Sequence, residues 1–299
     1  MDLVSRRTML AAPCFGTLAI AMAADATTAT TPGALANLST WMDLASVPGA
    51  SWAMLDGAGA ISSGAVGYAK ANAVPATPET LFEAASLSKV VLAVAVHDMV
   101  LEGLIDLDRP VAEHVAFTDD PATRSITPRH LLSHSSGLPN WRDEAGEPLT
   151  AAFSPGTRFR YSGEGFVLLG RLVEAVTGQT AAQVVEARVL RPAGMSRSTY
   201  GWPRGTEPAV AWAHDGGGGA LIDKGPAGYT MRRDAGPPKP VDRWTLGERE
   251  KAAVAIGKPA MPIFMTPNMA ADCGPPPATT CGSWLSHSAI RGSLRRPLE

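Results

Sequence analysis

A serine and a lysine three residues apart, Ser86 and Lys89, stand at the start of the most apolar segment of the chain. Residues 90–96 are all Val, Leu or Ala, and we expect one helix from Ser86 to about Glu102. Free N–H groups at a helix N-terminus favour negative charge at Ser86, and Lys89 would share its face. Apolar surroundings disfavour the ammonium form of a lysine. The amine could then take the hydroxyl proton and make Ser86 a nucleophile.

The Ser86–Lys89 pair also has an ordinary structural explanation. Serine is a frequent N-cap, and this spacing occurs often by chance. The apolar run after the pair favours the chemical interpretation, because a helix that is apolar on nearly every face is expected inside a large core. Gly103 provides a C-cap for the same helix. The rest of the chain must decide between the two explanations.

Two histidines, His130 and His134, are spaced by four residues and could share one face of a helix. Residues 126–134 predict a short helix with Thr127 as N-cap and Pro128 at its first position. No glutamate follows His130, as a zinc protease would require, and no third ligand suggests itself. We therefore expect a structural role for both histidines and no metal site.

The elements that would position these residues follow from turn signals and apolar periodicity. Asp56-Gly57 is a hairpin signal between residues 51–55 and 60–68, which we expect to form paired strands. Tyr161 lies in a predicted loop. Further helices are predicted at residues 35–44, 166–176, 180–190 and 246–256.

The composition is that of a globular protein with an ordinary surface. The 299 residues are 45% hydrophobic and 18% charged, with a formal net charge of -2. This length is sufficient for a substantial core. The charge balance gives no reason to expect a nucleic acid or an anionic membrane as partner.

The first residues have the pattern of an export signal. Arg6 and Arg7 form a twin-arginine motif, an apolar run extends to about Ala23, and residues 21–23 resemble a cleavage site. We expect a signal peptide at 1–23, a linker and first helix at 24–46, and a periplasmic destination. The run is too short for a mature membrane span, although an anchored helix is the alternative.

Two cysteines, Cys273 and Cys281, follow the expected signal segment. In an oxidising compartment they could pair across a short loop, or both could be free. No Cys/His spacing matches a zinc site.

Four segments in sequence order resemble the serine β-lactamase-related family, which includes penicillin-binding-protein-like hydrolases, class C β-lactamases, D-alanyl-D-alanine carboxypeptidases and esterases. Residues 77–89 are similar to its Ser-x-x-Lys segment, and residues 101–111 to the continuation of that helix. Residues 131–139 are similar to its Leu-Leu-Thr-His-Thr-Ser-Gly-Leu-Pro signature, and residues 192–195 to its Pro-Leu-Gly-Met turn. Together they indicate membership where each alone would be weak.

The resemblance implies a fold and a division of the chain. The fold would be α/β of the α+β type, β-lactamase/transpeptidase-like. An antiparallel sheet lobe would take its first strands from residues 50–70, and a helical lobe would cover about 80–200. The hydrolase domain would span residues 47–270, before an irregular tail at 271–299.

The resemblance also implies catalytic roles. Ser86 would attack a carbonyl and form an acyl-enzyme, Lys89 would take its proton, and Tyr161 would assist both. The backbone N–H of Ser86 would form half of an oxyanion hole. No metal or organic cofactor would be needed, and the substrate would be a small-molecule ester, a β-lactam or a peptidoglycan-like D-amino-acid peptide.

Two departures from the family pattern affect these expectations. Tyr161-Ser162-Gly163 lacks the asparagine of the Tyr-x-Asn motif, which helps to hold the amide of β-lactams, so esterase-like activity is favoured. The third motif, Lys-Thr-Gly or His-x-Gly, is not found, so the C-terminal sheet strands could be missing. A catalytically inactive ligand-binding protein and a truncated or frame-shifted fragment stay open as alternatives, as does the oligomeric state.

Overall fold

A computed structural model of the chain describes residues 33–57, 61–70, 74–142, 147–200, 210–214, 234–240, 243–255 and 269–271. The expected signal segment, the two cysteines and the tail beyond residue 271 lie outside the described residues. Among the described residues, no helix is both long enough and apolar enough to cross a bilayer.

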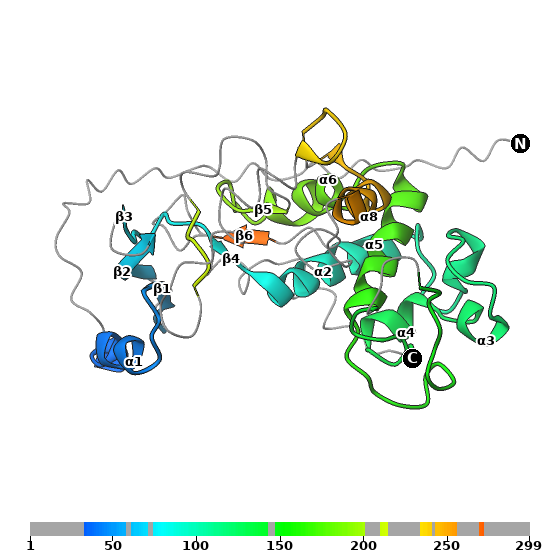
Figure 1. The fold of residues 1–299 in the computed structure, drawn as a ribbon, viewed down its shortest axis with the longest axis horizontal. Helices are drawn as coiled ribbons and strands as arrows, with labels where there is room; N and C mark the ends of the chain where they lie inside the picture. The colour runs from blue at the N-terminus through cyan, green and yellow to red at the C-terminus, as the bar shows by residue number, and fades with distance from the viewer. Residues whose placement is uncertain are drawn as a thin grey trace, which may run out of the picture. The chain divides into compact units, whose positions relative to one another are not determined.

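The core of the helical part forms where α2 (Ser88–Leu101) packs against α5 (Gly163–Thr177). Figure 1 shows these helices side by side, with α8 (Leu246–Ala255) next to α5. The helix α6 (Ala181–Val185) and the π-helical turn η4 (Glu186–Leu190) pack against α2 as well. The fully buried side chains of this core include Ala95, Val96, Met99, Leu169 and Val173.

Local capping chemistry sets the ends of several helices, and at Thr127 and Pro128 it does so as the sequence predicts. Thr127 caps α4 (Pro128–Leu132), and Pro128 occupies its first turn, where a missing N–H costs nothing. Thr180 caps α6 in the same way. Gly178 ends α5 at a φ of +67°, which glycine adopts without strain.

The expected single helix from Ser86 is wrong at its start. A 3₁₀ turn, η2 (Ala85–Leu87), comes first, and α2 begins at Ser88. Ala85, one residue before the expected start, has a φ of +43°, so a right-handed helix cannot extend back beyond Ser86. At its other end α2 closes as predicted. Gly103 has a φ of +75°, and its N–H bonds the carbonyl of Val100.

The expected burial of α2 is confirmed on most of its surface but not on all of it. One face is buried, including Val91 at 1% exposure, but Val90 is 49% exposed and Leu101 is 68% exposed. The apolar run extends around the helix, whereas α5, α6 and η4 pack against it from the buried side.

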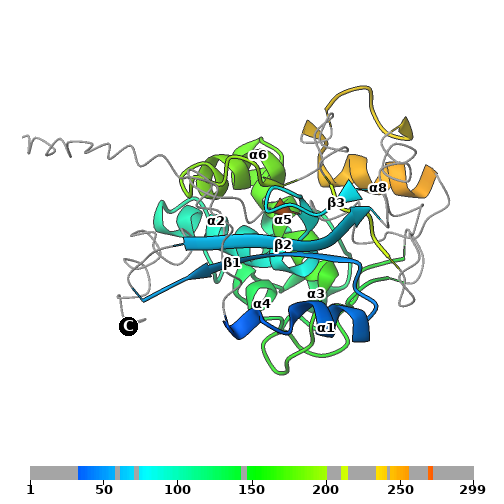
Figure 2. The same cartoon turned by 90° about the vertical axis from the view of Figure 1, so that its left-hand side faces the viewer.

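Two small antiparallel sheets complete the α+β class, which confirms the expected fold type. In the first sheet, β1 (Gly49–Leu55) pairs with β2 (Ile61–Lys70) from Gly49 opposite Gly67 to Leu55 opposite Ile61. Figure 2 looks onto this hairpin. A short β3 (Val74–Pro75) lies on the other side of β2.

The second sheet joins segments that are far apart in the chain. Figure 1 shows β6 (Met269–Ala271) between β4 (Phe82–Glu83) and β5 (Thr199–Tyr200). Because β4 directly precedes η2, this pairing fixes the approach to Ser86. The shorter elements are η1 (Gly33–Leu35), α1 (Leu38–Leu44), η3 (Val111–Glu113) and α3 (Pro121–Arg124).

Candidate functional site

The three side chains expected to carry the chemistry meet at the oxygen of Ser86. The Tyr161 hydroxyl donates a hydrogen bond to Ser86 Oγ at 2.9 Å, and Lys89 Nζ donates to the same oxygen at 3.3 Å. Lys89 reaches it from the first turn of α2, three residues after Ser86. Tyr161 comes from 75 positions later in the chain, so only the tertiary fold brings it there.

The N-cap of α5 sets the position of Tyr161. Ser162 is fully buried and extended, with φ −137° and ψ 117°. Its Oγ accepts from the N–H of Gly165 at 2.8 Å and donates to the carbonyl of Pro139 at 2.7 Å. Side chains on either side of an extended residue point away from that residue's own side chain. With Ser162 directed inward, Tyr161 is directed toward the pocket.

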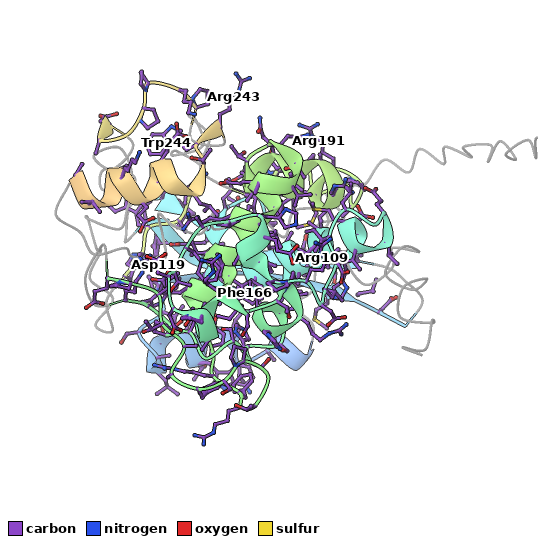
Figure 3. The ribbon with its side chains drawn as sticks, turned by 90° about the vertical axis from the view of Figure 1, so that its right-hand side faces the viewer. Arg109, Asp119, Phe166, Arg191, Arg243 and Trp244 are labelled. Carbon is purple, nitrogen blue, oxygen red and sulfur yellow. The ribbon has the colours of Figure 1, made fainter. Side chains whose placement is uncertain are left out.

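The electrostatics of the site act on the phenol of Tyr161. Partial burial pushes its pKa upward, but interactions with Lys89 and Ser86 and the positive charge of Lys89 outweigh burial, so the pKa is lowered. Lys89 Nζ lies 5.1 Å from the centroid of the Tyr161 ring and 5.9 Å from that of Phe166. Figure 3 marks Phe166 on α5, among the helices. The lowered pKa makes proton exchange between Tyr161 and Ser86 easier.

His134 belongs to the site, although the sequence interpretation gave it only a structural role. Its ring centroid is 4.5 Å from that of Tyr161. Burial and the nearby charge of Lys89 lower the pKa of its imidazole. The sequence did carry one signal for His134, because it lies within residues 131–139, which resemble the family signature. Its four-residue spacing from His130 gives no indication of a contact with Tyr161.

The indole of Trp141 fills the space next to Gly163. A Cβ atom at position 163 would lie 2.2 Å from Trp141 Cζ2 and 2.3 Å from Cη2, far inside van der Waals contact. The N–H of Gly163 also bonds the carbonyl of Asn140 at 3.0 Å, so the two backbones are held close. No side chain larger than hydrogen fits at position 163 while Trp141 keeps this place.

A buried ion pair fastens residues 140–142 to the start of α5. Glu164 is 0% exposed, and Arg142 bonds its carboxylate through Nε at 2.9 Å and Nη2 at 3.2 Å. Arg142 also reaches Glu250 on α8 at 3.2 Å. The segment that carries Trp141 is therefore anchored to two helices.

A pocket of about 600 Å³ opens beside Ser86. No cluster of three His, Cys, Asp or Glu side chains that could hold a metal occurs in the described parts of the chain. A hydroxyl, an amine and a phenol within hydrogen-bond reach can support acyl transfer. The pocket is lined largely by apolar atoms, from Ala84, Ser86, Leu87, Lys89, Val90, Ala93, Leu132, His134, Tyr161 and Phe166.

A protein-family model described as Beta-lactamase matches residues 36–268. Penicillin-binding protein 4 from Amycolatopsis lactamdurans is 30% identical over 185 residues, covering 56% of this chain and 49% of the relative. Esterase EstB from Burkholderia gladioli is 32% identical over 154 residues, covering 40% of this chain and 38% of the relative. The chain thus spans about half or less of the length of these relatives.

Among solved structures, the octameric penicillin-binding protein homologue from Pyrococcus abyssi superposes with a TM-score of 0.58. The alignment covers 87% of this chain and 55% of that protein, at 23% sequence identity. At this identity the likeness concerns the fold, which is of the β-lactamase/transpeptidase type.

Proposed function

The chain belongs to the beta-lactamase family of serine hydrolases, and on that premise we propose that it cleaves small esters through an acyl-enzyme on Ser86. The observation that carries the proposal is the convergence of Tyr161 and Lys89 on Ser86 Oγ, at 2.9 Å and 3.3 Å.

The proposed reaction begins when Lys89 or Tyr161 has lost its proton. The unprotonated group takes the proton of Ser86 as Oγ attacks the carbonyl carbon, and the backbone N–H of Ser86 donates to the developing oxyanion. The bond to the leaving alcohol breaks, and Tyr161 passes a proton to that oxygen. Water then attacks the acyl-enzyme, the acid departs, and Ser86 recovers its proton.

The preference for esters is supported by Gly163 and Trp141. An asparagine at position 163 would hold a substrate amide in the family pattern, and the indole occupies that space here. The mostly apolar lining of the pocket favours an acyl group without an amide. Relatives named as esterases support the preference for esters. A relative named as a penicillin-binding protein is the reason to test peptide-like substrates as well.

The test compares nitrocefin, short p-nitrophenyl esters and D-Ala-D-Ala peptides as substrates for the chain and its Ser86→Ala variant. We expect ester turnover by the parent, with a serine-directed probe attached at Ser86, and loss of both in the variant with unchanged unfolding temperature. Hydrolysis that survives Ser86→Ala would reject the nucleophile. Efficient nitrocefin hydrolysis without esterase activity would reject the substrate class.

Export to the periplasm belongs to the same proposal and is supported by the twin-arginine motif at Arg6 and Arg7. Cell fractionation of the parent and of a variant with both residues changed to lysine tests it. Parent protein found only in the cytoplasm would count against export.

A further inference from the structure

His134 bonds the backbone N–H groups of the residues before and after Tyr161. Its carbonyl accepts a hydrogen bond from the N–H of Arg160 at 2.8 Å, and its Nδ1 accepts from the N–H of Ser162 at 3.1 Å. The backbone before the tyrosine and the backbone after it are thus tied to one residue.

The imidazole ring also packs against the tyrosine side chain. The two ring planes are tilted by 34° with centroids 4.5 Å apart, and Phe166 and Phe159 lie 5.1 Å and 5.9 Å away. His134 does this from a φ of +54°, a conformation uncommon outside glycine but one that histidine tolerates better than most residues. Such a conformation persists only where the surrounding contacts enforce it.

The bond from Ser162 depends on the protonation state of the imidazole. Nδ1 can accept only while it carries no proton, so the ring must be neutral with its proton on Nε2. An imidazolium would bring two N–H donors face to face. It would also place a second positive charge near Lys89, whose charge together with burial lowers the pKa of His134.

We propose that neutral His134 is a positioning residue that aims the Tyr161 hydroxyl at Ser86, and that protonation of its imidazole releases this hold. The role rests on the proposed function, because it requires Tyr161 to serve Ser86. The groups that face the imidazole are Lys89 from α2, Phe166 from α5, and Phe159 and Tyr161 from the segment before α5.

Two variants separate the acceptor from the ring. His134→Asn places an oxygen near the position of Nδ1, tolerates a positive φ and does not titrate. His134→Phe keeps an aromatic ring but leaves the Ser162 N–H without its acceptor. His130→Asn is the matched control, because His130 Nδ1 accepts a similar bond from the Thr127 N–H on α4, which ends before His134.

The first measurement is the rate of Ser86 acylation by p-nitrophenyl acetate as a function of pH. We expect His134→Phe to be slower than the parent by about 10- to 100-fold at pH 8, the range expected for a small misplacement of a reacting group. His134→Asn should stay within several-fold of the parent at pH 8 and lose less rate on acidification. His130→Asn should keep the parent's pH profile.

The second measurement needs no turnover. The ¹⁵N chemical shift of the Ser162 amide should titrate in the parent with a midpoint below the usual histidine value of about 6.5, and should lose this titration in His134→Asn. A Ser162 amide whose ¹⁵N chemical shift does not change with pH would overturn the positioning role. A parent-like acylation rate in His134→Phe would overturn it as well. A parent whose Ser86 is never acylated would instead overturn the proposed function, whatever the amide shows.

Discussion

The two sides of the pocket are built in opposite ways. On the side of Tyr161, Ser162 and Glu164 are completely buried, and backbone and side-chain hydrogen bonds connect them to residues 139–142 and His134. On the side of Ser86, Leu87 is 65% exposed and Val90 is 49% exposed, and only a short strand and a 3₁₀ turn lead to the nucleophile.

This difference separates stability from chemistry. Buried polar groups with complete partners fix one geometry and are costly to disturb. An exposed turn contributes little to the free energy of unfolding but leaves the reacting oxygen open to substrate. Substitutions of the buried polar groups on the side of Tyr161 should therefore mainly lower the free energy of unfolding, whereas substitutions on the side of Ser86 should mainly change the rate.

The largest expected effect is on the rate, from Lys89→Arg. A guanidinium stays protonated and cannot accept the Ser86 proton, so ester kcat/KM should fall by about 10²–10⁴-fold, the usual contribution of a general base. The unfolding temperature should change little. Kinetic assays beside thermal unfolding measure both, and Lys251→Arg, on the exposed face of α8, is the control. Activity near that of the parent would end the assignment of Lys89 as base.

The coupling of Lys89 with Tyr161 sharpens that result. Lys89→Ala and Tyr161→Phe should each remove much of the rate. The fold-loss of rate in the double variant should be far smaller than the product of the two single fold-losses. Independent, multiplying losses would show that the two groups do not act as one unit.

The next largest effect is on stability, from Arg142→Met. This change removes the guanidinium that pairs with the buried Glu164 carboxylate and leaves it only the Arg142 backbone N–H, and removing one member of a buried pair costs about 3–5 kcal/mol. Urea unfolding measures the loss. The same substitution at Arg129, whose pair with Asp108 is exposed, should cost much less. Equal losses at the two sites would contradict the comparison between the two sides.

Gly163→Asn should cost about 1–3 kcal/mol of unfolding free energy, since its side chain must displace the Trp141 indole. Combining it with Trp141→Ala opens the space. We therefore expect the double variant to be more stable than the sum of the two single losses implies, in a double-mutant cycle by urea unfolding. Strict additivity would show that the indole moves aside freely.

The smallest effect is expected from Val90→Thr, within about 0.5 kcal/mol, because this valine is half exposed. The neighbouring Val91→Thr makes the same chemical change at a site that is 1% exposed, and should cost about 1–3 kcal/mol by burying a hydroxyl. Equal unfolding free energies for the two variants would contradict the one-sided burial of α2.

The sequence predicts those features that depend on neighbouring residues. Thr127, Thr180 and Gly178 fix helix ends by local chemistry, and Asp56-Gly57 indicates the β1–β2 hairpin. The spacing of Ser86 and Lys89 likewise predicts a shared face.

Features made by distant contacts are not predicted. The β6 strand pairs with β4 and β5 without any local signal, and the 3₁₀ turn η2 before α2 has none either. The roles of His134 and Trp141 in the site depend on their tertiary packing against Tyr161 and Gly163, respectively. A family motif locates Tyr161, but only the fold reveals what holds it in place.

The contact between Trp141 and Gly163 also has an evolutionary consequence. A lineage that acquired asparagine at position 163 first would carry a collision between that side chain and the indole. A lineage that first reduced Trp141 to a smaller residue would make room for the later change. The two substitutions are thus epistatic, and selection for amide-bearing substrates would be expected to accept them in one order, with position 141 changing before position 163.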